Sequence, residues 1–294
     1  MKAYPECFAC IFDQAIRVLR KSKFGNDDEK IWNSLLKVTN SVKDIPYGLT
    51  PAQLAEHFYP LLSEITGISD PYKEEKEYSN DLMLNIYDDL KNYILDSASP
   101  IVLAIKASIA GNMIDFGVPE FDPSGIESKI IQVIKEGKFG IDDSKEFLDM
   151  LNDSKKLLFI HDNCGEVVMD KLLIEIIKLF FSHIEVISVV RDGPIINDVT
   201  LNEARQIHLD DLASLITTNA KLPGLVPELM SEQLENEWEE ADIIISKGQG
   251  NFEGIEDIAD KRVFFLLRAK CDVIAKYLNV EKGDLVIKRG FKIN

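Results

Sequence analysis

From about Lys156 onward, short apolar segments alternate with longer segments of helical pattern. This alternation is typical of a mostly parallel sheet covered by helices, and it constrains the fold more than any other feature of the chain. The predicted strands are residues 157–161, 184–190, 214–218, 243–246, 263–267 and 284–287. The predicted helices between them lie around residues 167–181, 203–212, 227–239 and 272–277. We therefore expect an α/β fold.

The first hundred residues carry a different pattern. Apolar residues recur there at helical spacing, beginning with Phe8, Ile11, Phe12, Ala15, Val18 and Leu19. Thr50 and Pro51 form a predicted helix start, because threonine is a good N-cap and proline suits the first helical turn. A Ser- and Pro-containing stretch at residues 97–100 separates the two patterns. We expect a helical N-terminal domain at residues 1–97 and a catalytic domain at residues 98–294.

The charge balance excludes some classes of function. The formal net charge is −17 over 294 residues, which disfavours a nucleic-acid partner because phosphate backbones are bound by Lys and Arg clusters. The apolar runs are strand-length, shorter than the roughly 20 residues of a membrane-spanning helix. The N-terminus lacks the apolar core of a signal peptide. We expect a cytoplasmic protein without membrane or nucleic-acid partners; the sequence does not indicate its oligomeric state.

Polar residues follow several of the predicted strands directly. In open α/β sheets, ligands bind beyond the carboxyl ends of the strands, so these residues are the first candidates for a site. The set after the first, second and fourth strands includes Asp162, Asn163, Glu166, Asp198, Lys247, Gly248, Gln249, Gly250 and Asn251. Two carboxylates and an amide oxygen, from Asp162, Asp198 and Asn163, suit Mg²⁺ or Mn²⁺. Lys247 and the adjacent glycines suit a phosphate group.

Each of these motifs also has a purely structural interpretation. Asp162-Asn163 is compatible with a simple turn or helix cap, and so is the segment at residues 197–200. Lys247-Gly248-Gln249-Gly250 matches neither standard phosphate-loop pattern and is compatible with a plain loop. The functional interpretation is favoured because all three segments fall on one predicted edge of one sheet.

The cysteines and histidines give weaker signals. Cys7 and Cys10 have the CxxC spacing of half a zinc site or a redox pair, and a buried thiol pair is an equal alternative. Cys271 is a candidate further ligand for a second metal or redox site. His161 ends a strand, where we expect a satisfied core histidine or a residue that supports a metal ligand.

Taken together, the motifs resemble those of the damage-control phosphatases, a metal-dependent family formerly known only as a domain of unknown function. The resemblance spans nearly the whole chain and keeps the order of the motifs. The N-terminal CxxC and the KGQGN form are similar to the stand-alone archaeal and bacterial-type branch. The matching segments are Cys7 to Cys10, Asp70 to Lys76, Gly111 to Phe116, His161 to Glu166, Arg191 to Thr200, Ser246 to Glu253 and Leu267 to Cys271.

This resemblance implies a helical N-terminal region and a three-layer α/β/α Rossmann-like domain. It implies a divalent metal, Mg²⁺, Mn²⁺, Co²⁺ or Ni²⁺, at Asp162, Asn163 and Asp198. It also implies phosphate contact near Lys247, with Asn112, Asp115 and Glu166 close by. The expected activity is hydrolysis of phosphate monoesters on small metabolites such as sugar phosphates or damaged phospho-metabolites.

Two other classes of function stay open at this level. The sheet edge and the KGQG segment are compatible with a non-catalytic module that binds a nucleotide or phosphate for regulation. The CxxC pair is compatible with a structural or redox protein centred on Cys7 and Cys10. The sequence also leaves open whether Asp162 attacks phosphorus itself or only holds a metal while water attacks.

Overall fold

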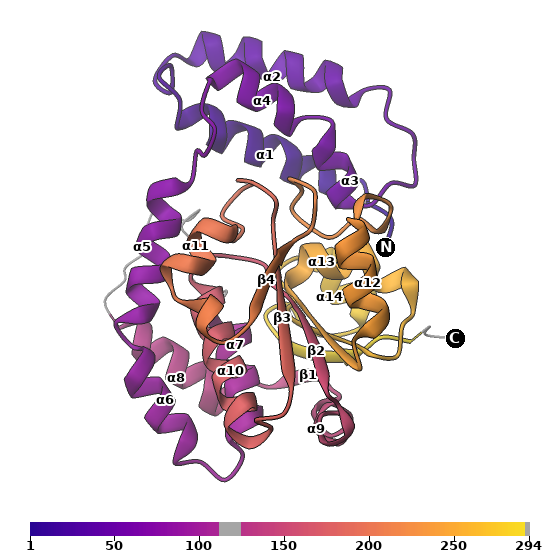
Figure 1. Cartoon of the computed structure of the whole chain (residues 1–294). Coiled ribbons are helices and arrows are strands. Elements are labelled where there is room, and N and C mark those ends of the chain that lie inside the picture. The colour runs from indigo at the N-terminus through magenta and orange to yellow at the C-terminus, as the bar shows by residue number, and fades with distance from the viewer. Residues whose placement is uncertain (112–124, 292–294) are drawn as a thin grey trace.

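The computed structural model of the chain describes residues 1–111 and 125–291. A seven-stranded sheet forms its centre, and helices surround the sheet (Figure 1). The strands are β1 (Phe139–Asp142), β2 (Lys156–Ile160), β3 (Glu185–Val190), β4 (Ser214–Thr217), β5 (Ile243–Lys247), β6 (Val263–Arg268) and β7 (Leu285–Arg289). Within the described ranges, no helix is long and apolar enough to cross a membrane.

The helices divide into an N-terminal group and a group that alternates with the strands. The N-terminal group is α1 (Cys7–Arg20), α2 (Asp28–Val42), α3 (Pro51–Glu56), α4 (Tyr59–Thr66), α5 (Lys73–Leu84), α6 (Tyr87–Leu95) and α7 (Pro100–Ala110). The second group is α8 (Ile126–Glu136), α9 (Ser144–Asp153), α10 (Glu166–Phe180), α11 (Leu201–Gln206), α12 (Glu232–Glu240), α13 (Gly248–Ile255) and α14 (Asp272–Leu278).

The strand order in the sheet is β1-β7-β6-β5-β2-β3-β4. Strands β2 to β6 are mutually parallel, and β7 pairs antiparallel with β6 and parallel with β1. The chain moves outward from β2 in one direction through β3 and β4, and then returns to place β5 on the other side of β2. The order therefore reverses between β2 and β5, which is where open α/β sheets bind ligands.

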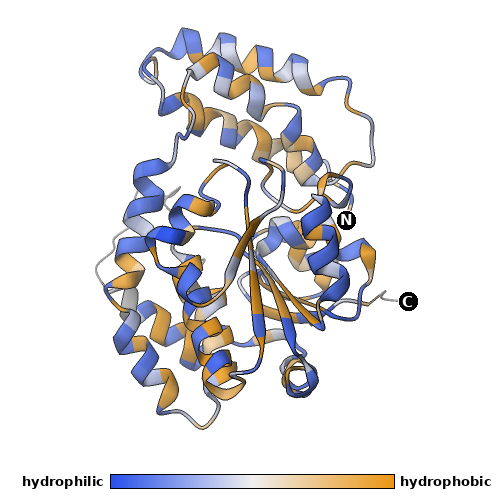
Figure 2. Ribbon diagram, in the orientation of Figure 1, coloured by the Kyte–Doolittle hydropathy of each residue, from blue (hydrophilic) through white to orange (hydrophobic). Residues whose placement is uncertain are grey.

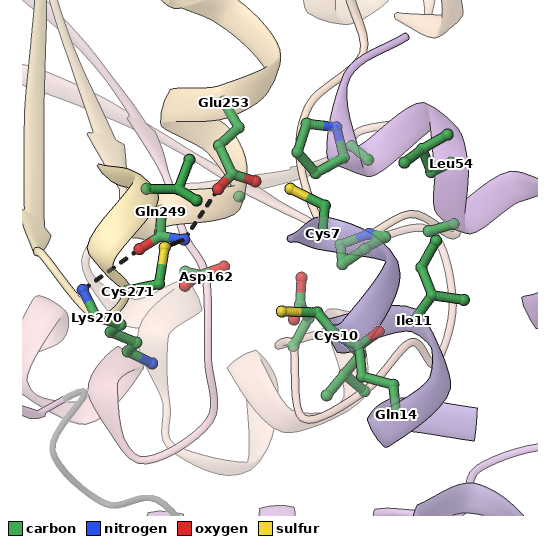
Figure 3. A pocket seen from close by; sticks show the side chains of 18 of the residues that line it. Cys7, Cys10, Ile11, Gln14, Leu54, Asp162, Gln249, Glu253, Lys270 and Cys271 are labelled. Atoms are coloured by element: carbon green, nitrogen blue, oxygen red, sulfur yellow. Dashed lines mark hydrogen bonds between the residues drawn. The ribbon is translucent and has the colours of Figure 1, made fainter. Parts of the chain in front are cut away.

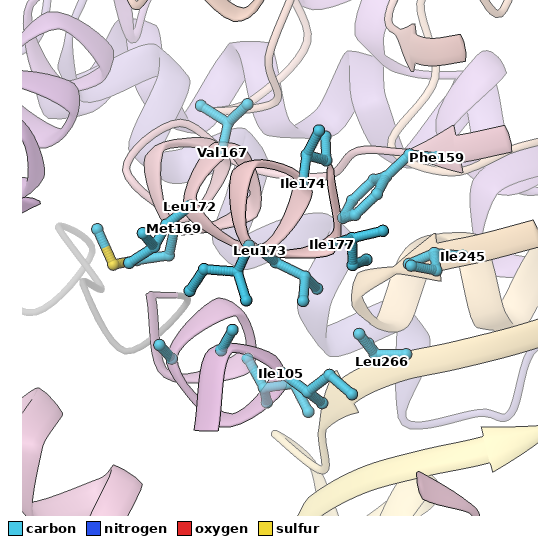
Figure 4. Close-up of a cluster of buried hydrophobic side chains, with 14 of the residues drawn as sticks. Ile105, Phe159, Val167, Met169, Leu172, Leu173, Ile174, Ile177, Ile245 and Leu266 are labelled. Atoms are coloured by element: carbon cyan, nitrogen blue, oxygen red, sulfur yellow. The ribbon is translucent and has the colours of Figure 1, made fainter. Parts of the chain in front are cut away.

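Both faces of the sheet are buried, and this gives the three-layer architecture. Alternate residues of β2 point to opposite faces: Leu157 and Phe159 belong to one apolar cluster, Leu158 and Ile160 to another. The first cluster includes side chains of α7 and α10, some of which are drawn in Figure 4, and the second includes side chains of α12, α13 and α14. Strands buried on both faces show as continuous orange segments in Figure 2. The predicted α/β fold with a mostly parallel sheet is confirmed.

The N-terminal helices pack in two ways. Helices α1 to α4 enclose an apolar cluster of their own, built around Leu19, Val38 and Leu62, and α1 and α3 lie across the carboxyl ends of the central strands (Figure 1). Helices α5 and α6 instead place Met83, Leu90 and neighbouring side chains in the cluster of α10 and the sheet. The division of the chain at residue 97 stays a prediction.

Several elements differ from the sequence-based expectation. Strand β1 was not predicted, because it is a four-residue edge strand whose residues are only partly buried. The segment expected as a glycine-containing loop after β5 begins helix α13 instead, with Lys247 as its N-cap. The helix expected at residues 203–212 is shorter, since α11 ends at Gln206 and a 3₁₀ turn follows it. The helix expected at residues 227–239 likewise divides into a 3₁₀ turn and α12.

The packing of α10 gives a direct test of the core. Leu173 is fully buried in the cluster of Figure 4, whereas Leu179 on the same helix is 63% exposed. We expect Leu173→Ala to lower the free energy of unfolding by about 2–5 kcal/mol, because a buried leucine loses its contacts and leaves a cavity. Leu179→Ala is the matched control and should change it by less than about 0.5 kcal/mol. Urea unfolding of both variants measures the difference, and equal values would contradict this packing.

Candidate active site

A cavity of about 300 Å³ lies between helices α1 and α3 and the carboxyl ends of β2, β3, β5 and β6. One wall is mainly apolar and comes from the N-terminal helices, with Ile11, Leu54 and Phe58 among its residues. The other wall is polar and comes from the segments that follow the strands. Its polar lining residues are Asp162, Asn163, Asn197, Asp198, Gln249, Glu253 and Lys270. Figure 3 shows Asp162 facing the thiols of α1 across this space.

The three predicted metal ligands meet in this cavity. Asp162, Asn163 and Asp198 all line it, although they come from the ends of two strands. The two segments are joined by backbone hydrogen bonds from Val199 N to Asp162 O (2.9 Å) and from Cys164 N to Asn197 O (2.8 Å). The Asn163 side chain donates to Asp162 Oδ2 at 2.7 Å. Local backbone pairing thus fixes how the three side chains are presented.

Arg191 lies beneath the two carboxylates and is almost wholly buried. Its Nε donates to Asp198 Oδ2 at 2.6 Å, and its Nη2 lies 3.5 Å from Asp162 Oδ1. Its Nη1 donates to Asn251 Oδ1 at 3.0 Å. A guanidinium has five N–H donors in a rigid fork, so Arg191 can orient several acceptors at once.

Asn251 holds Arg191 in place by accepting its hydrogen bond. Asn251 is not among the described residues that line the cavity. Its Nδ2 donates to the backbone oxygens of Lys247 (2.7 Å) and His161 (3.1 Å). Lys247 is the last residue of β5, and His161 is the first residue after β2. Because both amide hydrogens bind backbone oxygens, the side-chain oxygen is fixed toward Arg191. Asn251 therefore joins the two strands on either side of the point where the strand order reverses.

The electrostatics of the carboxylates fit a cation. Burial raises the pKa of Asp198 to about 7, against the lowering effect of Arg191, and burial also raises the pKa of Asp162. Two buried carboxyl groups next to one guanidinium are thus short of positive charge. A hard divalent cation bound by Asp162, Asn163 and Asp198 would supply it, and its affinity would rise with pH as the carboxyls lose their protons. Among the described residues, this site included, no group of three His, Cys, Asp or Glu side chains is arranged to hold a metal, so the proposed cation depends on the Asn163 amide oxygen as its third ligand.

The first residue of α13 must be glycine for this arrangement to exist. Gly248 has a φ of +78°, and a Cβ atom there would lie 1.9 Å from Asp162 Oδ2. The N-terminal turn of α13 therefore approaches the Asp162 carboxylate as closely as a backbone can. Gln249 and Gly250 follow in the same turn and line the cavity. The unpaired N–H groups of a helix N-terminus make such a turn suited to an anion.

Lys247 extends away from the cavity into a buried cluster of charges. Its ammonium nitrogen lies 2.6 Å from Glu166 Oε1, 2.6 Å from Asp170 Oδ1 and 3.1 Å from the Ser108 backbone oxygen. Asp170 also bonds His161 Nδ1 at 3.0 Å, so the strand-ending histidine is a satisfied buried residue. The structure thus places Lys247 and Glu166 below the site, next to Asp170. The sequence analysis had not singled out Asp170.

Two other predicted sites differ in how far the structure describes them. Asn112 and Asp115 lie outside the described residues.

Cys7, Cys10 and Cys271 all line the cavity, the first two from α1 and the third as the N-cap of α14. Burial raises the pKa of the Cys7 and Cys10 thiols, so they are held as neutral thiols in this environment.

Sequence reasoning gave no role to Glu253 or Lys270, both of which line the cavity. Both lie inside segments that carry the family resemblance, Ser246 to Glu253 and Leu267 to Cys271, but neither segment indicates a role for them. Glu253 stands four residues after Gln249, which places both side chains on the same face of α13. A sequence-based prediction of a helix at this position would therefore have placed Glu253 in the cavity wall.

The contact between Gly248 and Asp162 yields a prediction for metal binding. Gly248→Ala should weaken Mn²⁺ binding by about tenfold or more, because the new methyl group displaces the Asp162 carboxylate. Gly67→Ala is the matched control, since Gly67 has a similar φ of +69° but open space around it. Titration calorimetry with Mn²⁺ distinguishes backbone strain from the steric effect, and equal losses of affinity in both variants would contradict the assignment.

The charge cluster under the site yields a prediction for pH. Burial raises the pKa of Glu166 to about 8 in the folded protein, while Lys247 opposes the shift. The folded state then holds a proton that the unfolded state releases above its ordinary pKa, so this contribution to stability is present below about pH 4.5 and is lost as pH rises toward 8. In the parent protein, the free energy of unfolding should therefore fall between pH 5 and 8 by about 1.4 kcal/mol for each unit by which the pKa of Glu166 is raised. Glutamine does not titrate, so this part of the fall should be absent in Glu166→Gln.

Urea unfolding in the presence of a metal chelator, at a series of pH values, measures this effect. Glu185→Gln, an exposed glutamate at the start of β3, is the control and should leave the pH dependence unchanged. A variant at Glu166 whose stability varies with pH as steeply as that of the parent protein would show that Glu166 is ionised in the fold.

Comparison with known proteins supplies the family. Residues 3–286 match the damage-control phosphatase ARMT1-like domain. The chain is 35% identical to a damage-control phosphatase of Pyrococcus horikoshii over 100% of both chains, and 31% identical to one of Archaeoglobus fulgidus over 98% of this chain and 99% of that one. A crystal structure of a DUF89 family protein from P. horikoshii superimposes with a TM-score of 0.89 at 34% identity, covering 99% of each chain. The predicted family is confirmed: the chain belongs to the ARMT1-like damage-control phosphatases.

Proposed function

We propose that the protein is a metal-dependent phosphatase that hydrolyses phosphate monoesters of small metabolites. The observation that carries this proposal is the meeting of Asp162, Asn163 and Asp198 in one cavity at the point where the strand order reverses. The names of the P. horikoshii and A. fulgidus relatives support a phosphatase. A cavity of about 300 Å³ fits a small phosphorylated metabolite rather than a macromolecule.

The cation would be held by Asp162, Asn163 and Asp198, with Arg191 fixing the orientation of the carboxylates. A divalent metal such as Mg²⁺, Mn²⁺, Co²⁺ or Ni²⁺ supplies Lewis-acid polarisation of the phosphate and of a water nucleophile. Asn163 orients Asp162 through the hydrogen bond to Oδ2, and Arg191 orients Asp198. Because both carboxylates are oriented to act as metal ligands, Asp162 is not assigned as the group that attacks phosphorus. We assign that attack to a water molecule.

The phosphate group would lie between these residues and the N-terminal turn of α13. The backbone N–H groups of that turn favour an anion there, and Lys270 from the segment after β6 adds a positive charge to the same wall. Lys247 contributes indirectly, because its ammonium group is engaged by Glu166 and Asp170. We therefore assign the predicted phosphate contact to the α13 backbone and Lys270, with Lys247 as a support below them.

The apolar wall from α1 and α3 would receive the organic part of the substrate. It covers the site from water, which strengthens electrostatic interactions with the phosphate. The alternative of a non-catalytic module that binds a nucleotide or phosphate uses the same cavity but predicts binding without turnover.

Phosphate release from p-nitrophenyl phosphate tests the proposal. Metal-stripped protein should be inactive, and activity should return when Mg²⁺, Mn²⁺, Co²⁺ or Ni²⁺ is added singly. Asp198→Ala should reduce the restored rate by at least about 100-fold, because a metal ligand and the partner of Arg191 are both lost. Asp192→Ala is the control, since Asp192 lies in the same segment but is exposed and bonds Thr217.

Two results would contradict the proposal. Turnover without any metal, or equal activity of the Asp198→Ala and Asp192→Ala variants, would exclude this metal centre as the catalytic site. Binding of phosphate compounds without turnover under any metal would favour the regulatory module.

A further inference from the structure

Glu253 is a buried carboxyl group in the cavity wall that the hydrolysis described so far does not use. It lies on α13, one helical turn after Gln249, and its side chain is only 8% exposed. Figure 3 shows its carboxyl group above Asp162, between Gln249 and Cys7. The same cavity thus holds the three candidate metal ligands, of which Asp162 and Asp198 are acidic, and the further acidic group of Glu253.

The hydrogen bonds around Glu253 fix which oxygen can carry a proton. Gln249 Oε1 accepts a bond from the Lys270 backbone N–H at 3.3 Å, which orients the Gln249 amide group. Its Nε2 then donates to Glu253 Oε1 at 2.9 Å. Because an amide nitrogen can only donate, Oε1 acts as an acceptor, and the proton of a neutral Glu253 resides on Oε2.

Burial keeps a large fraction of this group protonated near pH 7. Burial raises the pKa of Glu253 to about 7, and the charge of Asp162 acts in the same direction. The bond from Gln249 and the ammonium group of Met1 lower it. Glu6 and Lys270 line the same cavity, and the Cys7 and Cys10 thiols face Glu253 as neutral groups.

We propose that Glu253 is the general acid of the reaction, which donates its Oε2 proton to the leaving oxygen of the substrate. This inference rests on the proposed phosphatase function of the same cavity. Hydrolysis of an alkyl phosphate needs such a donor, because an alkoxide is a poor leaving group. Glu253 stands on the wall opposite the apolar helices, beside the space assigned to the organic part of the substrate.

The step balances without an added reactant. The oxygen of a water molecule forms a new bond to phosphorus, and the bond between phosphorus and the leaving oxygen breaks. The electron pair of the broken bond goes to the leaving oxygen, which takes the proton from Glu253 and departs as an alcohol. A proton from the attacking water, passed through solvent, returns Glu253 to its acid form.

The test compares Glu253→Gln on two substrates of the metal-loaded protein, ethyl phosphate and p-nitrophenyl phosphate. Glutamine keeps the shape of the side chain and an acceptor for Gln249, but it has no acidic proton. We expect kcat/KM for ethyl phosphate to fall by roughly 100-fold or more. For p-nitrophenyl phosphate we expect a loss below about threefold, because p-nitrophenolate leaves without protonation.

Glu256→Gln is the matched control, three residues further along and hydrogen-bonded to Tyr277 outside the cavity. It should leave both rates unchanged. In the metal-loaded parent protein, the rate on ethyl phosphate should fall as rising pH removes the Glu253 proton, while the rate on p-nitrophenyl phosphate does not. This pH comparison needs no variant and so tests the proposal even if Glu253→Gln does not fold.

Other outcomes overturn the inference. Equal losses on both substrates would assign Glu253 to metal or phosphate binding, and unchanged rates on both would exclude a role in proton transfer. Absence of turnover of either substrate by the metal-loaded parent protein would overturn the phosphatase function itself, and the general acid with it.

Discussion

The pairing of one buried guanidinium with two buried carboxylates is the constraint on which the rest of the site depends. Arg191 bonds Asp198 directly and lies 3.5 Å from Asp162, and all three are nearly excluded from water. Buried charges are costly unless they are paired, so this arrangement is kept only where the surrounding fold holds it. The remaining negative charge is what a divalent cation would balance. The same feature therefore explains both the local structure and its fitness for metal-assisted chemistry.

The fold supplies that arrangement through backbone geometry. The reversal of strand order between β2 and β5 opens a gap at the carboxyl ends of these strands, and Asn251 bonds backbone atoms on both sides of it. Gly248 lets α13 begin against Asp162, where any side chain would collide. Below, Lys247 joins Glu166 and Asp170, so the floor of the site is a second paired charge cluster. Rigid elements thus position each polar group before a ligand binds.

The sequence predicted the central parts of this account for physical reasons. Asp162 and Asn163 follow β2 closely and Asp198 lies in the segment after β3, and the ends of parallel strands meet at one sheet edge, so their proximity could be inferred. The direction of Lys247 could not, because only its tertiary partners Glu166 and Asp170 draw it below the sheet edge. Helix α13 was missed since its glycines argue against a helix, and Glu253 was missed with it. Strand β1 is short and half-exposed, which leaves no periodic signal.

The most direct test of the central claim is the location of the metal. We would soak crystals of the protein in Mn²⁺ and measure anomalous scattering at the manganese absorption edge. The account predicts a single strong peak within coordination distance of oxygens from Asp162, Asn163 and Asp198, with Arg191 still bound to Asp198. A peak at the thiols of Cys7, Cys10 and Cys271, with none between the two carboxylates, would contradict it.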